Sequence, residues 1–405
     1  MACGSVRALG TAILLSIGLA ACSGDPPDLD RQKARAKAND HYANGATAFG
    51  RYCALCHASD ATGYAADHAP SLVSPTFLES ASDQFIARAL REGRPGTAMA
   101  AYSKAVGGPL DDGEIDDIIT YLRERHPARL FLPAFPITGD AVRGEALYAD
   151  TCQRCHGSRM VRGDAVHLAN PVLLASASDA FLRHAILHGR PGTPMPAFRD
   201  ALDDDQVNDL VAFIRSWVTP AAPPRPPMPE APPLGPVVIN PNGPSPQFNL
   251  RDGRFVPIAD VKAALDQKKR IVIIDARASS DWMAMRIPGS ITIPYYLFDR
   301  LDAMPKDGTW ITAYCACPHH ASGAVVDELR KRGFKNTAVL DEGILEWKKR
   351  GYPIEGSAPP QVPGTAPGVP GDATTTTAPP LRTAAPPLRV IPPSLRLPVV
   401  PGQRR

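Results

Sequence analysis

The stretch Cys-Ala-Leu-Cys-His at residues 53–57 returns as Cys-Gln-Arg-Cys-His at residues 152–156. In each copy two cysteines lie three positions apart and a histidine follows directly, so both thiols fall on one helical turn. This is the pattern that attaches a c-type haem, in which each thiol forms a thioether and the histidine is the proximal iron ligand. One copy alone would also fit a zinc or redox Cys-x-x-Cys beside a chance histidine. Two copies with matching flanks predict two covalent haem sites.

The residues before each pentapeptide repeat as well. A glycine, an aromatic residue and the first cysteine follow one another at intervals of four, which keeps them on one face of a helix. These residues are Gly45, Phe49 and Cys53 in the first copy and Gly144, Tyr148 and Cys152 in the second.

Each copy continues with two more expected helices. An amphipathic helix is predicted to begin near Ser82-Asp83, and again near Ser178-Asp179, where serine or aspartate can cap it. Amphipathic helices at 114–123 and 205–217 close the copies. Their aromatic residues are expected to pack on the first helix of the copy: Tyr121, Phe213 and Trp217.

A Gly/Pro-rich segment precedes a methionine in each copy, Gly-Arg-Pro-Gly-Thr-x-Met at 93–99 and 189–195. Because proline and glycine disfavour a helix, we expect an extended loop that presents the methionine thioether to the iron. Two alternatives remain: the methionines pack in the core, or His68 and His167 supply the sixth ligand. His184 and His188 are expected on a helix surface.

With these motifs, residues 41–218 resemble two tandem class I cytochrome c domains, 41–126 and 127–218. The resemblance implies an all-α fold, two covalently attached haem c groups and electron transfer to a redox partner protein. It assigns the thioether bonds to Cys53, Cys56, Cys152 and Cys155. It assigns the axial iron ligands to His57, Met99, His156 and Met195.

The amino terminus has the features of an export signal. A weakly basic start is followed by an apolar run over residues 8–20, too short to span a bilayer. The run ends in Leu-Ala-Ala-Cys at 19–22, which resembles a bacterial lipobox. We therefore expect a signal peptide over 1–21, a lipid on Cys22, a tether over 22–40 and a periplasmic location, with Ser23 slightly favouring the outer membrane. The alternative is an ordinary signal peptide with an incidental cysteine.

Proline is abundant, with 44 residues, and most of them lie in two segments. Residues 219–246 are expected to form a polyproline-type linker, and residues 356–405 a disordered tail. The net charge of +3 gives no support for nucleic-acid binding.

Between these segments, residues 247–355 alternate between strand and helix patterns. Strands are predicted at 271–274, after 287–289, at 310–314 and at 338–340, and helices at 261–265, 324–332 and from Gly343. Apolar strands alternating with helices indicate a parallel sheet covered on both faces. Cys315 lies between a strand and a helix, where backbone N–H groups and a helix amino terminus favour the thiolate.

The order of these elements resembles a single rhodanese domain. The matching residues are Asp275-Ala276-Arg277, Ile287-Pro288-Gly289, Tyr314-Cys315, Gly343, Trp347 and Gly351-Tyr352-Pro353. The resemblance implies that Cys315 is the nucleophile that accepts a sulfane sulfur as a persulfide.

The loop at 315–322, Cys-Ala-Cys-Pro-His-His-Ala-Ser, departs from that family because it has no arginine to hold an anionic donor. His319 or His320 would have to replace it. Three interpretations stay open: an active sulfurtransferase or persulfide carrier, an inactive binding module, and a metal or redox site formed by Cys315, Cys317 and the two histidines.

Together these patterns predict an exported dihaem electron carrier coupled to a sulfur-handling domain that takes sulfur from a sulfane donor. The alternative is a plain electron shuttle whose third domain only docks a partner. Adjacency in one chain does not by itself establish the coupling.

Overall fold

The computed structural model describes residues 29–133, 136–219, 229, 231–316 and 319–356. The expected signal peptide, Cys22, the proline-rich tail and Cys317 lie outside the described residues. The chain divides into two compact units, residues 1–40 and 41–405, and every contact discussed below lies within the second.

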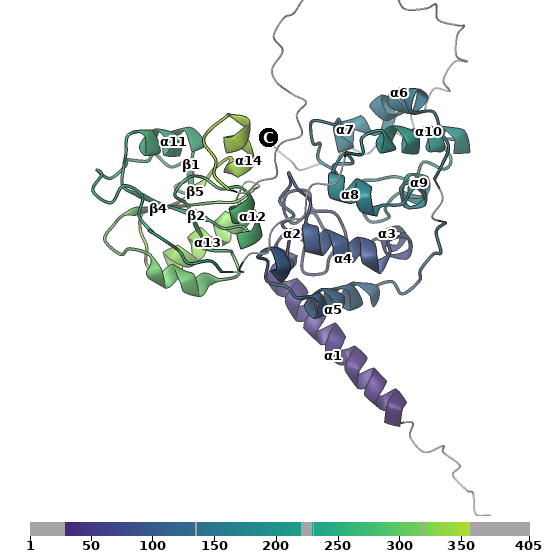
Figure 1. Cartoon of the computed structure of the whole chain (residues 1–405), viewed down its shortest axis with the longest axis horizontal. Helices are drawn as coiled ribbons and strands as arrows, with labels where there is room; N and C mark the ends of the chain where they lie inside the picture. Colours follow the sequence, from purple (N-terminus) through teal and green to yellow (C-terminus); the bar gives the residue numbers. More distant parts are fainter. Residues whose placement is uncertain (1–28, 134–135, 220–228, 230, 317–318, 357–405) are drawn as a thin grey trace, which may run out of the picture. The chain divides into compact units, whose positions relative to one another are not determined.

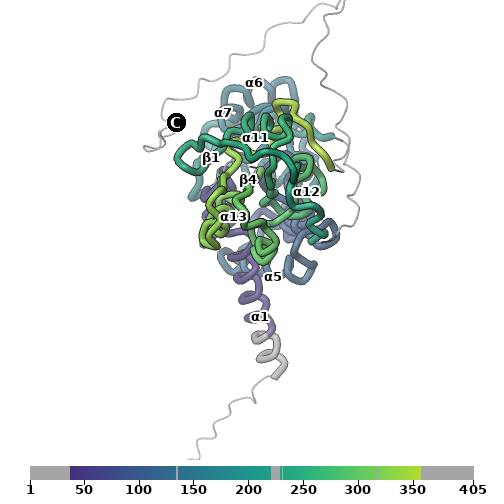
Figure 2. The backbone as a smooth tube through the Cα atoms, turned by 90° about the vertical axis from the view of Figure 1, so that its left-hand side faces the viewer, coloured from purple at the N-terminus to yellow at the C-terminus, as the bar shows by residue number. Residues whose placement is uncertain are grey.

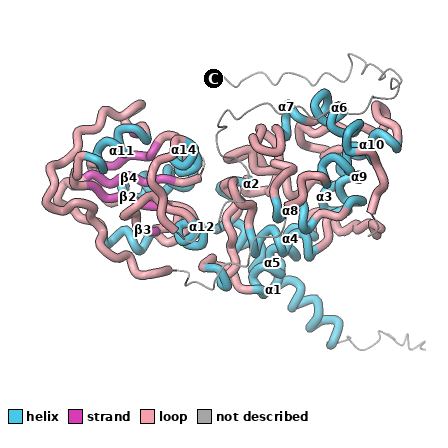
Figure 3. The backbone as a smooth tube through the Cα atoms, turned by 45° about the horizontal axis from the view of Figure 1, so that its top comes forward, coloured by secondary structure: helices cyan, strands magenta, loops and turns pink. Residues whose placement is uncertain are grey.

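The two repeats consist of helices and loops, drawn in cyan and pink in Figure 3. The first repeat contains α1 (Leu29–Tyr52), α2 (Ala54–His57), α3 (Pro75–Ser80), α4 (Asp83–Glu92), the 3-10 helix η1 (Lys104–Val106) and α5 (Asp112–Arg123). The second contains α6 (Ala141–Thr151), α7 (Gln153–His156), α8 (Pro171–Ser176), α9 (Asp179–His188) and α10 (Asp204–Arg215). The predicted helices of both repeats are confirmed.

The first and last helices of each repeat cross at a glycine. A Cβ atom on Gly45 would lie 2.0 Å from the carbonyl oxygen of Asp117, and one on Gly144 would lie 2.0 Å from that of Asp209. The absence of a side chain thus lets the helix backbones touch.

The expected aromatic residues pack beside these crossings. The ring centroids of Phe49 and Tyr121 are 5.2 Å apart, and those of Tyr148 and Phe213 are 5.4 Å apart. Trp217 meets Tyr148 edge-on at 5.0 Å. The predicted packing of the closing helix on the first helix is confirmed.

The short helices are held by caps and by one arginine per repeat. Ser82 accepts a hydrogen bond from the backbone N–H of Phe85, and Ser178 does the same for Phe181. Arg123 is buried and donates to the carbonyl oxygens that end α3. Arg215 makes the corresponding bonds at the end of α8. These arginines satisfy carbonyl groups that a helix end leaves unpaired.

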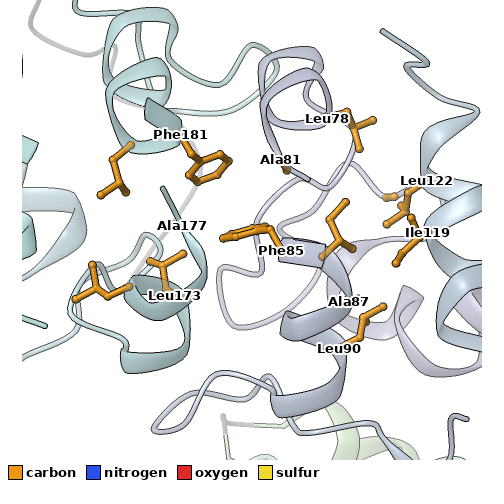
Figure 4. Packing of buried hydrophobic residues seen from close by; sticks show 14 of the residues in the cluster. Leu78, Ala81, Phe85, Ala87, Leu90, Ile119, Leu122, Leu173, Ala177 and Phe181 are labelled. Carbon is orange, nitrogen blue, oxygen red and sulfur yellow. The ribbon is translucent and has the colours of Figure 1, made fainter. Parts of the chain in front are cut away.

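The two repeats meet through equivalent elements. Helix α3 contacts α9, and α4 contacts α8. Phe85 of α4 and Phe181 of α9 face each other with ring centroids 4.8 Å apart, as Figure 4 shows. Thr76 donates to the carbonyl oxygen of Gly189 over 2.7 Å, and Asn170 donates to that of Pro95 over 3.0 Å. The methionine loops therefore contribute to this junction from both sides.

The C-terminal domain is built on a five-stranded parallel sheet, drawn in magenta in Figure 3. Its strands are β1 (Phe255–Val256), β2 (Ile271–Asp275), β3 (Ile291–Thr292), β4 (Trp310–Tyr314) and β5 (Thr337–Leu340), in the order β1-β5-β4-β2-β3. Its helices are α11 (Ile258–Asp266), α12 (Ser279–Ala284), the 3-10 helix η2 (Phe298–Ala303), α13 (His320–Lys331) and α14 (Gly343–Lys349).

Helices cover both faces of this sheet, as predicted. All five residues of β2 are buried, and they alternate between two cores. Val272 and Ile274 pack in the core that includes residues of α13 and η2, whereas Ile271 and Ile273 pack in the core that includes α11 and α14. In Figures 1 and 2, α11 and α13 lie on opposite sides of the strands.

One difference from the sequence prediction concerns the linker over 219–246. Leu234 and Val238 pack partly buried against the C-terminal core, and Ile239 forms an antiparallel bridge with Ile271. Apolar residues interrupt the prolines there and supply both side chains and N–H groups for pairing. The C-terminal domain thus gains residues that the composition had assigned to the linker.

No helix within the described residues is both long enough and apolar enough to cross a lipid bilayer.

Candidate functional site: two haem-attachment turns and a buried cysteine

The predicted proximal histidines are held in the same way in both repeats. His57 Nδ1 lies 2.9 Å from the carbonyl oxygen of Pro70, and His156 Nδ1 lies 2.7 Å from that of Val166. A carbonyl can only accept, so Nδ1 carries the proton and Nε2 keeps its lone pair for a metal. Burial lowers the pKa of both rings, which favours the neutral, ligating form.

The cysteines flank these rings on the same turn. Cys53 is the residue before α2, and Cys56 lies within it. Burial raises the pKa of both thiols to about 12, so both are protonated and uncharged near neutral pH. Burial also raises the pKa of the Cys152 thiol. A neutral imidazole with a free Nε2 beside two apolar thiols is the donor set of a covalent haem c, and the residues fit that group.

The methionine loops also match each other atom for atom. The backbone N–H of Arg94 donates to the carbonyl oxygen of Met99 over 2.8 Å, and Arg190 donates to Met195 over 3.0 Å. The N–H of each methionine donates to a threonine hydroxyl two positions earlier. The predicted non-helical loop is confirmed, and its turn fixes each methionine. That these thioethers bind iron stays a prediction.

The alternative histidine ligands are engaged elsewhere. His167 Nε2 lies 3.0 Å from the carbonyl oxygen of Ser158. His68 is half exposed and has its Nε2 3.8 Å from the Asp164 carboxylate of the second repeat. Neither contact favours iron ligation over the methionines.

The expectation that His184 lies on a helix surface is wrong. His184 is buried, and its Nε2 lies 3.0 Å from the Glu79 carboxylate of the first repeat, while its ring contacts His188 at 4.4 Å. Helix α9 is covered by α3, and no pattern within α9 alone could show that partner.

Cys315 follows β4 and is 2% exposed. Its Sγ lies 3.3 Å from the hydroxyl of Ser322 on α13. Gly343 has a φ of 70°, and a Cβ there would lie 2.8 Å from the Cys315 carbonyl oxygen, so the turn into α14 closes against the cysteine. The predicted strand, cysteine and helix order is confirmed, whereas the thiolate state of Cys315 stays a prediction.

The histidines of the loop do not both replace the missing arginine. His319 Nε2 lies 2.7 Å from the Asp341 carboxylate, which also binds Arg251, and its ring stacks on Phe255. This pairing occupies His319 in a side-chain network. Among the residues that the structure describes, no group of three or more His, Cys, Asp or Glu side chains could hold a metal ion, and Cys317 of the proposed metal site is not among them.

Sequence reasoning missed a set of tyrosines that joins the C-terminal domain to the first repeat. Tyr295 donates to the carbonyl oxygen of Tyr52, and its hydroxyl lies 3.1 Å from that of Tyr102. Tyr296 meets the ring of Tyr52 edge-on at 5.0 Å. No periodicity marks these residues, because each pairs with a distant part of the chain.

Comparison with known proteins agrees with this geometry. The family model described as cytochrome c oxidase, cbb3-type, subunit III matches residues 40–122 and 139–214. The rhodanese-like domain model matches residues 258–350.

Three curated relatives are similar to parts of this chain. A dihydro-heme d1 dehydrogenase of Pseudomonas aeruginosa is 42% identical over 98 residues, 24% of this chain and 18% of that protein. The cbb3-type cytochrome c oxidase subunit FixP of Bradyrhizobium diazoefficiens is 29% identical over 186 residues, 43% of this chain and 60% of that subunit. Cytochrome c55X of Stutzerimonas stutzeri is 33% identical over 82 residues, 20% of this chain and 72% of that protein.

The chain thus spans less than two thirds of the first two relatives, and their whole activities are not transferred to it. The repeated haem-attachment turns and the family matches lead to the same conclusion. The chain belongs to the c-type cytochromes, which bind haem c covalently, and it joins two cytochrome c segments of the cbb3 subunit III type to a C-terminal rhodanese-like domain.

Proposed function

We propose that this chain is an exported dihaem electron carrier whose rhodanese-like domain handles sulfane sulfur on Cys315. The observation that carries the haem part is the duplicated bond from His57 and His156 Nδ1 to a backbone carbonyl. This bond leaves the Nε2 atom of each histidine available to serve as the fifth ligand of an iron ion, once in each repeat. Each bound haem supplies one-electron transfer.

Cys53 and Cys56 hold the first haem, and Cys152 and Cys155 hold the second. Met99 and Met195, fixed by their turns, would supply the sixth iron ligands. A thioether in the sixth position excludes a substrate from the iron and raises the reduction potential relative to two histidines. The haem domains therefore carry electrons and perform no bond chemistry of their own.

The haem stoichiometry tests this part directly. A pyridine haemochrome assay on the purified, full-length protein should return two haems per chain that acid acetone does not extract. One haem, or an extractable one, would contradict the proposal.

For the rhodanese-like domain, the position of Cys315 between β4 and α13 supports a nucleophilic role. The thiolate attacks a sulfane sulfur such as that of thiosulfate, an S–S bond forms on Cys315, and the donor leaves as sulfite. Backbone N–H groups at a helix amino terminus favour the thiolate that this attack needs.

Sulfur transfer to cyanide tests this role. The activity should be abolished in Cys315→Ser and should survive in part in Cys317→Ser, because Cys317 lies beyond the strand end beside a proline without an N–H group. Equal loss in both variants would indicate a two-cysteine site. No activity with any sulfane donor would assign the domain to partner docking.

The location and partners belong to the same proposal. The lipobox over residues 19–22 supports a lipid on Cys22 and a periplasmic position at the membrane, where a redox protein accepts the electrons. We propose the haem domains over 41–126 and 127–218, and a rhodanese-like domain whose amino-terminal boundary extends back from 247 to Leu234 because that residue packs on its core.

A further inference from the structure

The rhodanese-like domain contacts the first haem repeat through a tyrosine cluster, which consists of Tyr52, Tyr102, Tyr295 and Tyr296. Tyr102 and Tyr295 share a hydrogen bond of 3.1 Å between their hydroxyls, and Tyr295 also donates to the Tyr52 carbonyl. The rings of Tyr295 and Tyr296 lie edge-on at 5.0 Å. Burial raises the pKa of Tyr102 and Tyr295, so both hydroxyls keep their protons.

A further bond extends the same contact. The hydroxyl of Ser280, at the start of α12, donates to the carbonyl oxygen of Ala101 over 2.6 Å. Ala101 and Tyr102 lie immediately after the Met99 loop, and Tyr52 directly precedes Cys53. The domain thus binds the chain at both segments that hold the first haem.

The second repeat lacks this chemistry. The position that matches Tyr52, directly before the first cysteine, is Thr151, and the position that matches Tyr102, three after the methionine, is Phe198. Phenylalanine has no hydroxyl to pair with Tyr295. The contact is therefore specific to the first repeat.

This contact brings the reactive cysteine to the haem-attachment turn. Helix α13, which begins after the Cys315 loop, contacts α2, which carries Cys56 and His57. Cys315 Sγ lies 3.3 Å from the hydroxyl of Ser322 on α13, so the contact of α13 with α2 brings the Cys315 loop toward the first haem-attachment turn. An oxidised sulfur on Cys315 would therefore lie on the side of the domain that faces the first haem-attachment turn.

The electron count limits what the haems can do here. Transfer of a sulfane sulfur from thiosulfate to Cys315 moves no net electrons, so it cannot use a haem. Capture of sulfide does: one thiol and one hydrogen sulfide form an S–S bond and release two protons and two electrons. Two ferric haems, held by His57 and His156, would supply the acceptors for those two electrons, one each. Because Cys315 is 2% exposed, a donor as small as sulfide suits the site.

We propose that Cys315 oxidises inorganic sulfide to a Cys315 persulfide and that the electrons enter the chain at the haem held by His57. The tyrosine cluster positions the domain for this entry. This inference rests on the proposed function of Cys315 and names its substrate class and its internal electron acceptor.

The test uses the full-length ferric protein and anaerobic sodium sulfide. Intact mass should show one added sulfur atom on Cys315, and absorbance should show two haem equivalents reduced per sulfur added. In Cys315→Ser, sulfide can reduce the haems only directly, and this background is subtracted from the reduction seen in the wild type. Reduction of the haems at the wild-type rate in Cys315→Ser would overturn the inference.

Docking is tested in the same protein by two variants. Tyr295→Ala should slow the Cys315-dependent reduction about tenfold, since a small displacement of a reacting group has a large effect on rate. It should also increase hydrogen exchange in residues 49–56 and 99–103. Tyr102→Phe keeps the ring, removes one hydrogen bond and should slow the reduction about fivefold. Tyr352→Phe is the matched control, because Tyr352 packs on Trp347 in another core and should change neither readout.

The outcomes separate the two proposals. Wild-type rates and wild-type exchange in both docking variants would overturn the inference. Persulfide formed from thiosulfate, without any Cys315-dependent haem reduction by sulfide, would also overturn it and leave the proposed sulfur chemistry intact. Failure of every sulfur donor to modify Cys315 would overturn both.

Discussion

Replacing Gly45 by alanine should destabilise the first haem domain, although alanine is the better helix former. A Cβ atom at position 45 would lie 2.0 Å from the Asp117 carbonyl oxygen and 2.9 Å from Tyr121 Cβ. Ordinary contact begins at 3.4 Å, so α1 and α5 would have to separate by more than 1 Å. The nearest atoms are the backbone carbonyl oxygen and carbon of Asp117, which cannot move away by a side-chain rotation.

Overpacking of this kind costs about 2–3 kcal/mol, beyond the roughly 1 kcal/mol that alanine gains over glycine in helix propensity. For a domain of under 100 residues, the net loss of about 1–2 kcal/mol lowers Tm by roughly 4–16 °C. Because α1 leads directly into Cys53 and α5 carries Tyr121, the separation should also weaken the methionine bond to iron. Thermal unfolding followed by far-UV circular dichroism and by the methionine-to-iron absorption band measures both effects.

Gly50 provides the control on the same helix. Nothing lies within 4 Å of a Cβ atom at this position, so Gly50→Ala should leave Tm unchanged or raise it. A Gly45→Ala variant as stable as the wild type, or stabilised to the same degree as Gly50→Ala, would refute the close helix crossing.

Three further predictions concern ligation, anchoring and the sheet. Met99→His and Met195→His should each remove half of the long-wavelength band of ferric methionine ligation, and absence of that band in the wild type would contradict the assignment. Cys22→Ser should release the protein from membranes in cell fractionation, since no lipid would then be attached; unchanged fractionation with normal processing would count against a lipid anchor. Asp275→Asn should destabilise the rhodanese-like domain by about 3 kcal/mol in urea titration, because buried Arg277 loses its nearer carboxylate at 2.6 Å and keeps only Asp281 at 3.8 Å; loss of less than about 1 kcal/mol would show that Asp281 suffices to pair Arg277.

The haem-attachment chemistry was readable from the sequence because it depends on short spacings. Two thiols and a histidine must share one helical turn, and a methionine must follow a turn that proline and glycine impose. The strands of the rhodanese-like domain were readable for a related reason, since a run such as 271–274 is apolar on both faces only when both faces are covered.

The partners of these local units could not be read in the same way. His184 was expected at the surface because the sequence of α9 does not show that α3 packs over this helix. Leu234 and Ile239 were assigned to a linker because composition does not show that Leu234 packs on the C-terminal core or that Ile239 pairs with Ile271 of β2.

The sequence by itself therefore determined the covalent chemistry, the two repeats and the class of the third domain. Only the tertiary structure decided that Tyr52, Tyr102 and Tyr295 come together and that α13, which follows the Cys315 loop, contacts α2 of the first haem turn. Covalent attachment and helix formation depend on neighbours a few residues apart. Burial of a hydroxyl or a thiol against another domain depends on which surfaces meet, and residues as far apart as 52 and 295 carry no spacing that records it.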